Sequence, residues 1–267
     1  MSYFPLFKIG DSSGFVSIPN FAPTNWKPLS SQTRYLHAFK LGMDKWECTY
    51  IEELKSGEFG TYSTDEYKVV NRKTDEGVEV AEFTLFVLHH EIISDRALDE
   101  LPKSTLPKTT PEWRATIGFK NNGSQVSYQG EINPFPPKAS LLTFHPFIQY
   151  QDIRNYFVFL NLESNPKHRW VELKIYSNKS QSYVATYQVR NNAANIIFLD
   201  ELGIQPDDLP IFTTDSMAGV PFGFGVSKST SMLSLEHTHP PASLTLHGDR
   251  SMAQRSIKKN WSLYINK

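Results

Sequence analysis

Two stretches of the chain match each other at a fixed distance along the sequence. Moving residues 25–39 forward by 108 positions lays them on residues 133–147 without a gap. The register then continues for a short distance, and identical residues face each other at Asn25 and Asn133, Pro28 and Pro136, His37 and His145, Phe39 and Phe147, Asp44 and Asp152, Leu54 and Leu162, and Ser56 and Ser164. A repeated stretch of this kind predicts two copies of one fold.

A second match joins the ends of the two predicted copies. With an offset of 105, the pair Gly118-Phe119 falls on Gly223-Phe224, and Glu131 falls on Glu236. The smaller offset needs a net deletion of three residues, which connecting loops tolerate.

Strand-like runs occupy most of the chain between these matches. Short segments rich in Val, Ile, Tyr, Phe and Thr alternate with polar turn residues, which is typical of β-strands. The expected strands include residues 46–52, 78–89, 113–119, 124–131, 156–162, 170–176, 183–189 and 194–199. Asn122-Gly123 favours a tight hairpin turn because both residues tolerate positive φ. This pattern predicts an all-β fold, a sandwich or barrel.

The predicted organisation follows from the repeat. We expect an N-terminal arm over residues 1–24, in which one short strand could form, and two tandem, related antiparallel β-sandwich domains over residues 25–132 and 133–245. Residues 246–267 form the C-terminal tail. Ile257, Trp261, Tyr264 and Ile265 lie at helical spacing there, which predicts a short amphipathic helix.

Composition favours a globular protein in a reducing compartment. The chain has 267 residues, of which 39% are hydrophobic, and 27 basic residues balance 28 acidic ones. No run is long and apolar enough for a membrane span, and the N-terminus lacks the pattern of a signal peptide. A single cysteine, Cys48, excludes an intrachain disulfide. We therefore expect a cytoplasmic protein that contacts neither membrane nor nucleic acid.

The segment Glu236-His237-Thr238-His239 is the sharpest local signal for chemistry. Two histidines at i and i+2 on a strand point to the same face, about 6.5–7 Å apart, as in strand-borne metal sites. His237 and His239 are therefore candidate ligands of a divalent metal, and His247 is a candidate third ligand. Histidines that only form structural hydrogen bonds are the alternative interpretation.

His37 and His145 occupy equivalent positions in the predicted repeat. They could form a paired ligand site, one per copy, or each ring could pack beside the neighbouring Phe39 or Phe147. We place them, together with Glu236, among the candidate ligand-binding residues. His89-His90-Glu91 ends a predicted strand and is interpreted as a solvated strand end. No convincing nucleophile motif or phosphate-binding loop accompanies these residues, so the sequence leaves open whether the protein is an enzyme.

Part of the second copy resembles the small β-sandwich of the sensory rhodopsin transducer family. The resemblance covers residues 156–221 and rests on YFVFLNL (156–162), VELKIY (171–176), YQV (187–189), LDEL (199–202) and VPF (220–222). It implies a cytoplasmic, oligomeric module that binds or signals rather than catalyses.

These observations predict a non-enzymatic, homo-oligomeric binding or assembly module, which takes a small polar ligand or a protein partner. The expected site is the cleft between the copies or the face that holds His237 and His239. The alternative is a metal-dependent enzyme of cupin-like chemistry, with those two histidines as ligands and an open coordination position.

Overall fold

The computed structural model describes residues 2–20, 33–103, 114–138, 140–142, 152–204, 208 and 210–237. Within these residues the protein is all-β, as predicted, and no helix there is long and apolar enough to cross a membrane. The one helical element of this part is a short 3₁₀ turn, η1 (Asp200–Leu202). The predicted C-terminal helix lies outside the described residues.

The strands fall into two sets along the chain. The first half contains β1 (Phe4–Leu6), β2 (Ser13–Pro19), β3 (Arg34–Leu41), β4 (Trp46–Leu54), β5 (Phe59–Ser63), β6 (Asn71–Lys73), β7 (Glu79–Ala81), β8 (Thr84–His89), β9 (Arg96–Leu98), β10 (Ala115–Asn121) and β11 (Ser124–Gly130). The second half contains β12 (Ser140–Leu142), β13 (Ile153–Asn161), β14 (Trp170–Ser177), β15 (Ser182–Arg190), β16 (Ala193–Phe198), β17 (Ile211–Thr214), β18 (Val220–Ser227) and β19 (Leu233–His237).

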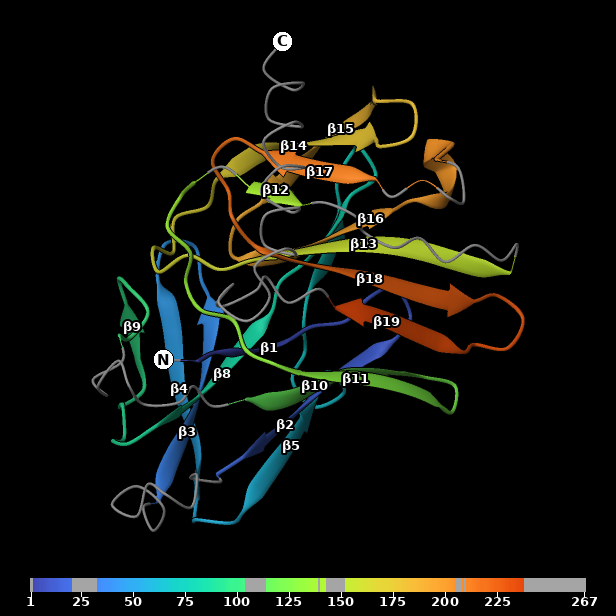
Figure 1. Ribbon diagram of the computed structural model, residues 1–267. Coiled ribbons are helices and arrows are strands. Elements are labelled where there is room, and N and C mark those ends of the chain that lie inside the picture. The colour runs from blue at the N-terminus through green and yellow to red at the C-terminus, as the bar shows by residue number, and fades with distance from the viewer. Residues whose placement is uncertain are drawn as a thin grey trace, which may run out of the picture.

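The strand order is the same in the two halves. The first half forms the sheets β1-β8-β3-β4-β9 and β11-β10-β2-β5, and the second half forms β12-β17-β14-β15 and β19-β18-β13-β16. To compare the halves, we leave out β6, β7 and β9 and number the remaining strands of each half from one to eight along the chain. In both halves the strand order is then 1-6-3-4 in one sheet and 8-7-2-5 in the other. The described strands therefore repeat one antiparallel arrangement (Figure 1).

This arrangement corrects how the halves correspond in sequence. The offset of 108 lays β4 on β13, which are the fourth and the second strands of their halves. The offset of 105 lays β10 on β18, which are both the seventh. The first match therefore does not follow the structural correspondence, whereas the second does.

Two strands form in the region where the sequence predicted an N-terminal arm. Residues 4–6 and 13–19 form β1 and β2, which pair with β8 and with β10 and β5. Phe4, Val16 and Ile18 are fully buried. These strands are short and rich in Gly, Ser and Pro, so they carry little of the alternation by which strands are found in a sequence.

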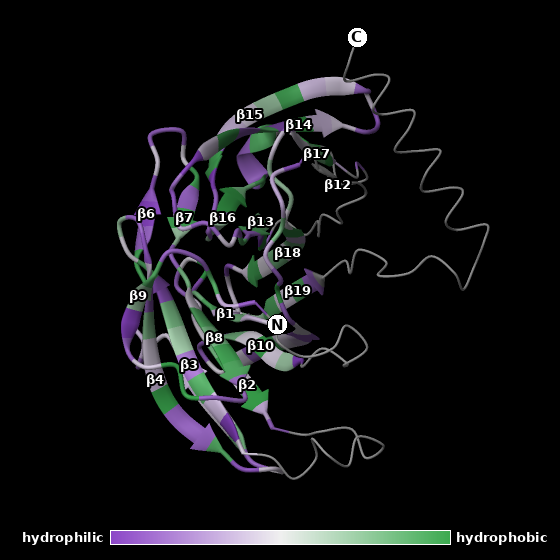
Figure 2. Cartoon of the chain, turned by 90° about the vertical axis from the view of Figure 1, so that its left-hand side faces the viewer, coloured by the Kyte–Doolittle hydropathy of each residue, from purple (hydrophilic) through white to green (hydrophobic). Residues whose placement is uncertain are grey.

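Three clusters of buried hydrophobic residues fill the spaces between the sheets. One, which includes Phe4, Val16 and Phe86, fills the interior of the first half. A second, which includes Phe157 and Phe212, whose rings stack with centroids 3.6 Å apart, fills the second half. The third lies between the halves, and we call it the shared cluster. Figure 2 shows hydrophobic residues along these inner strands, while β6 and β9 are hydrophilic.

The halves are joined by a sheet as well as by the shared cluster. Strand β7 pairs with β16, so that β6 and β7 extend the second half's sheet to β19-β18-β13-β16-β7-β6. The predicted continuous strand over residues 78–89 is in fact two strands, β7 and β8, because the chain leaves one sheet after Ala81 and enters another at Thr84. The division into two tandem domains stays a prediction.

Equivalent hairpins of the two halves contact each other. Phe119 on β10 and Phe224 on β18, which the offset of 105 pairs, meet edge to face with ring centroids 5.2 Å apart. Asn122 Nδ2 in one hairpin turn donates to Ser231 Oγ beside the other, at 3.3 Å. Asn122 and Gly123 have φ of 41° and 88°, which confirms the predicted tight turn.

Candidate functional site

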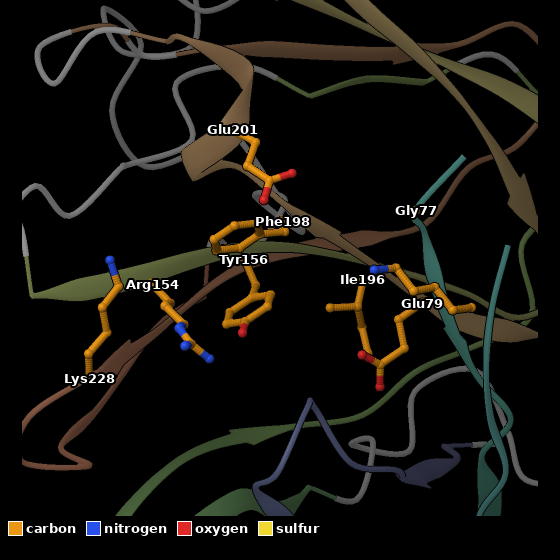
Figure 3. Close-up of a pocket in the computed structure, with 9 residues that line it drawn as sticks. Gly77, Glu79, Arg154, Tyr156, Ile196, Phe198, Glu201 and Lys228 are labelled. Atoms are coloured by element: carbon orange, nitrogen blue, oxygen red, sulfur yellow. The ribbon is translucent and has the colours of Figure 1, made fainter. Parts of the chain in front are cut away.

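The described part of the chain contains a pocket of about 500 Å³ on the six-stranded sheet. Its floor is formed by Tyr156 of β13 and by Ile196 and Phe198 of β16. These residues lie on the sheet face that packs against the first half, since Ile196 belongs to the shared cluster and Tyr156 packs against it. The pocket therefore opens where this face extends beyond the shared cluster (Figure 3).

Charged side chains surround the apolar floor. Arg154 and Lys228 lie at one end and Glu79 at the other, with Glu201 of η1 above the floor (Figure 3). Lys73, the cross-strand neighbour of Glu79, also lines the pocket. Three basic and two acidic side chains line the pocket, which leaves a formal charge of +1. A volume of this size lies within the range of sites for small ligands.

The hairpin of β6 and β7 forms one wall of the pocket. Gly77 lies in its turn with φ of 90°, a value that favours glycine. Lys73 and Glu79 face each other across the two strands, and Asn71 Nδ2 donates a short hydrogen bond to Glu79 Oε1. Asn71 Nδ2 also contacts the Lys8 carbonyl at 3.4 Å. The hairpin is thus bound both to the second half's sheet and to the β1–β2 loop.

Tyr156 is held in a neutral, hydrogen-bonding state. Burial raises the pKa of its hydroxyl, while the charge of Arg154 and a hydrogen bond with it act in the opposite direction. The ring lies 5.4 Å from that of Phe198, centroid to centroid, at an angle of 45°. The hydroxyl can therefore act as a hydrogen-bond donor beside two apolar ring surfaces.

The histidines predicted to bind metal are mostly outside the described residues. His239, His247 and His145 all fall there, and of His237 only the backbone is described, as the last residue of β19. Glu236 is exposed on β19, opposite Gly223 of β18. Among the described residues no three His, Cys, Asp or Glu side chains lie close enough together to share a metal ion. The metal site stays a prediction.

His37 is fully buried on β3. Its Nε2 accepts a hydrogen bond from the Ile93 amide at 2.9 Å, which places the ring proton on Nδ1. The ring lies 5.7 Å from that of Tyr50 and 6.3 Å from that of His89. His89 is itself buried and its Nδ1 contacts the Glu91 amide at 3.1 Å, so the prediction of a solvated strand end is wrong for His89.

We expect the free energy of unfolding to fall on acidification because of His37. Burial, followed by the charge of His89, lowers the pKa of His37 to about 4. The unfolded chain binds a proton near pH 6.5 and the folded protein does not. Stability should therefore decrease from about pH 6.5 to pH 4, by roughly 3 kcal/mol if each pKa unit is worth 1.36 kcal/mol.

The measurement is urea unfolding between pH 7 and 4 for the wild type and His37→Gln, whose amide oxygen can still accept the Ile93 amide hydrogen. The variant should lose less stability across this range, whereas His168→Gln, at an exposed position, should follow the wild type more closely. Titration of His37 above pH 6 in NMR spectra would contradict the expectation.

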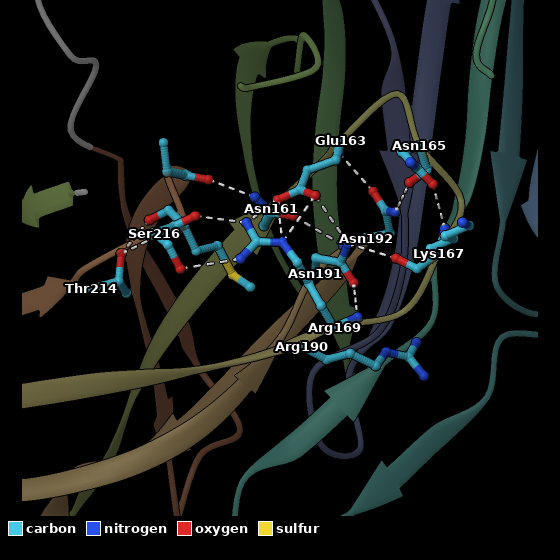
Figure 4. A network of polar contacts seen from close by, with 12 residues as sticks. Asn161, Glu163, Asn165, Lys167, Arg169, Arg190, Asn191, Asn192, Thr214 and Ser216 are labelled. Carbon is cyan, nitrogen blue, oxygen red and sulfur yellow. Dashed lines mark hydrogen bonds and ion pairs between the residues drawn. The ribbon is translucent and has the colours of Figure 1, made fainter. Parts of the chain in front are cut away.

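A buried polar network joins the loops at one end of the second half (Figure 4). The Arg169 guanidinium binds both carboxylate oxygens of Glu163, at 3.1 and 3.2 Å from Nε, and donates to the Ser216 carbonyl at 2.7 Å. Asn191 Nδ2 donates to Glu163 Oε2 at 3.1 Å, and Asn192 Oδ1 accepts from the Glu163 amide at 2.6 Å. These groups satisfy one another, so we interpret the network as structural.

The network also supports the contact between the halves. Trp46 Nε1 donates to the Ser164 carbonyl at 2.9 Å, and Arg190 Nη1 pairs with Glu82 Oε1 at 3.2 Å. These bonds run from the loop at Ser164 and from Arg190, the last residue of β15, to residues of the first half. The network thus fixes the surface on which the first half packs.

Sequence reasoning missed the residues of the pocket. Arg154, Tyr156, Lys73 and Glu79 belong to no motif, and the only available signal was the side-chain alternation that any strand through residues 154–156 would have. That alternation places Arg154 and Tyr156 on one face. It does not show that β7, from the other half, lies on the same sheet.

No protein-family model, no curated protein and no solved structure matches the chain. The resemblance to the sensory rhodopsin transducer family therefore stays a prediction.

Proposed function

We propose that this protein is a non-enzymatic binding module, and that it binds a small polar ligand in the pocket between its halves. The observation that supports this most is the composition of the pocket: an apolar floor surrounded by side chains of both charges and contributed by both halves. A ligand there would contact the β6–β7 hairpin and the second half's own strands at once. The cleft between the copies is the location that the sequence suggested.

Three charged side chains of the pocket lie at the protein surface. Arg154, Lys73 and Glu201 are exposed and take part in no ion pair within the described residues. Ile196 is 2% exposed, which makes the floor part of the packed interior and therefore rigid. Rigid apolar surface with a few polar groups in fixed positions is the arrangement that orients a small ligand.

The proposal is tested by covering the pocket. A panel of sugars, sugar acids, amino acids and nucleotides is screened by ligand-observed NMR against the wild type, Glu201→Trp and Glu172→Trp. We expect at least one binder in the panel whose signal is lost in Glu201→Trp, because the indole occupies the space above the floor. Glu172 is exposed on β14, away from the pocket, so its variant should bind like the wild type.

If Glu201→Trp and Glu172→Trp bind the same compound equally well, its site lies outside the pocket, and this result would contradict the proposal. The cytoplasmic location, the homo-oligomeric state and a protein partner stay predictions, as does the metal-dependent alternative at His237 and His239.

A further inference from the structure

We infer that the ligand of this pocket is an acidic saccharide: a sugar acid whose carboxylate binds Arg154 and Lys228 and whose hydroxyl groups bind Glu79 and Glu201. This inference rests on the proposed function and names the chemical class of the ligand. It follows from how the charges, the rings and the strands are arranged around the floor.

The cationic end of the pocket fits a carboxylate. Arg154 projects from β13, and Lys228 follows the last residue of β18, the neighbouring strand. Both side chains lie at the same end in Figure 3. A guanidinium binds a carboxylate with two parallel hydrogen bonds, and the Tyr156 hydroxyl beside it can donate a further one.

The acidic side chains fit neutral donors better than a cation. Glu79 already accepts a hydrogen bond from Asn71. Its remaining acceptor capacity suits a hydroxyl group. With a formal charge of +1, the pocket as a whole favours an anion over a zwitterion or a cation.

The apolar floor fits the carbon face of a sugar ring. Tyr156 and Phe198 present tilted ring surfaces beside Ile196, and such surfaces take an apolar face while polar groups at the rim bind the ring's substituents. Glu79 is opposite Ile196 of β16, which is opposite Val158 of β13, so Arg154 lies two strands across the sheet and four residues along it from Glu79, about 17 Å between Cα atoms. A ligand that contacts both residues must therefore extend along the strands as well as across them.

The inference is tested with two probes, digalacturonate and the neutral disaccharide lactose, by isothermal titration calorimetry on the full chain at low salt. We expect digalacturonate to bind at least about tenfold more tightly than lactose, and the difference to shrink as salt is raised. Arg154→Gln should weaken digalacturonate binding about tenfold and lactose binding much less. Arg114→Gln, at an exposed arginine of the first half, should leave both affinities unchanged.

Three results would overturn the inference. Equal affinities for the two probes, or an equal loss of both in Arg154→Gln, would mean that the pocket takes saccharides without selecting for acid. Binding of neither probe, together with an amino acid or nucleotide whose signal Glu201→Trp removes, would assign another ligand class while leaving the proposed function intact. If Glu201→Trp changes the binding of no compound at all, the proposed function itself fails.

Discussion

Glu163→Ala is expected to lower the free energy of unfolding by about 3 kcal/mol, which is the scale for removing one partner of a buried ion pair. The Glu163 side chain is 7% exposed and binds the Arg169 guanidinium through both oxygens. Without the carboxylate, a guanidinium that is 29% exposed loses its counter-ion, and the Asn191 amide loses one of its acceptors. Urea unfolding followed by circular dichroism measures the change.

The matched control for this variant is Glu172→Ala. Glu172 is also a glutamate of the second half, but its side chain is 55% exposed and its contact with Lys174, at 3.8 Å, is on the surface. Exposed pairs contribute little, so this variant should change stability by less than about 0.5 kcal/mol. A loss below about 1 kcal/mol in Glu163→Ala would show that the network does not hold the loops.

Phe222→Ala is expected to cost about 3–5 kcal/mol, the range for removing a buried phenylalanine ring. Phe222 of β18 is fully buried in the shared cluster, and its ring centroid lies 6.0 Å from that of Phe7 and 6.1 Å from that of Tyr128. Because this cluster takes residues from both halves, the substitution should lower the midpoint of one cooperative unfolding transition for the whole chain. Differential scanning calorimetry measures both effects.

Phe59→Ala is the control for the second variant, because Phe59 is 65% exposed and its truncation leaves no cavity. It should leave the calorimetric transition almost unchanged. Two separate transitions in the wild type, of which Phe222→Ala shifts only one, would show that the halves unfold independently. That outcome would also favour the division into two tandem domains.

Several elements could be predicted because they depend on local conformation. Asn122 and Gly123 form a tight turn because their backbones tolerate positive φ, and this holds wherever the hairpin lies in the fold. The strands of the second half, β13 to β16, were predicted close to their observed bounds because alternation and turn residues are clear there. The offset of 105 also identified hairpins that are equivalent in space, because β10 and β18 retain the same residues at matching positions.

Other features depended on contacts between distant segments. β1 and β2 have weak local signals and are strands because β8, β10 and β5 pair with them. His37 has the same side chain in any fold, and only the packing of β3 shows that its ring is buried and accepts a hydrogen bond from the Ile93 amide. The match at an offset of 108 shows that a few identical residues do not establish which strands correspond.

The sequence by itself determined that the chain forms antiparallel strands, where most of them turn, and which hairpins of the two halves match, since each of these depends on neighbouring residues. Only the tertiary structure decided that Lys73 and Glu79 lie on one sheet with Arg154 and Tyr156, more than 70 positions away in the chain. The pairing of β7 with β16 creates that neighbourhood, and it depends on how the two halves pack rather than on any local pattern.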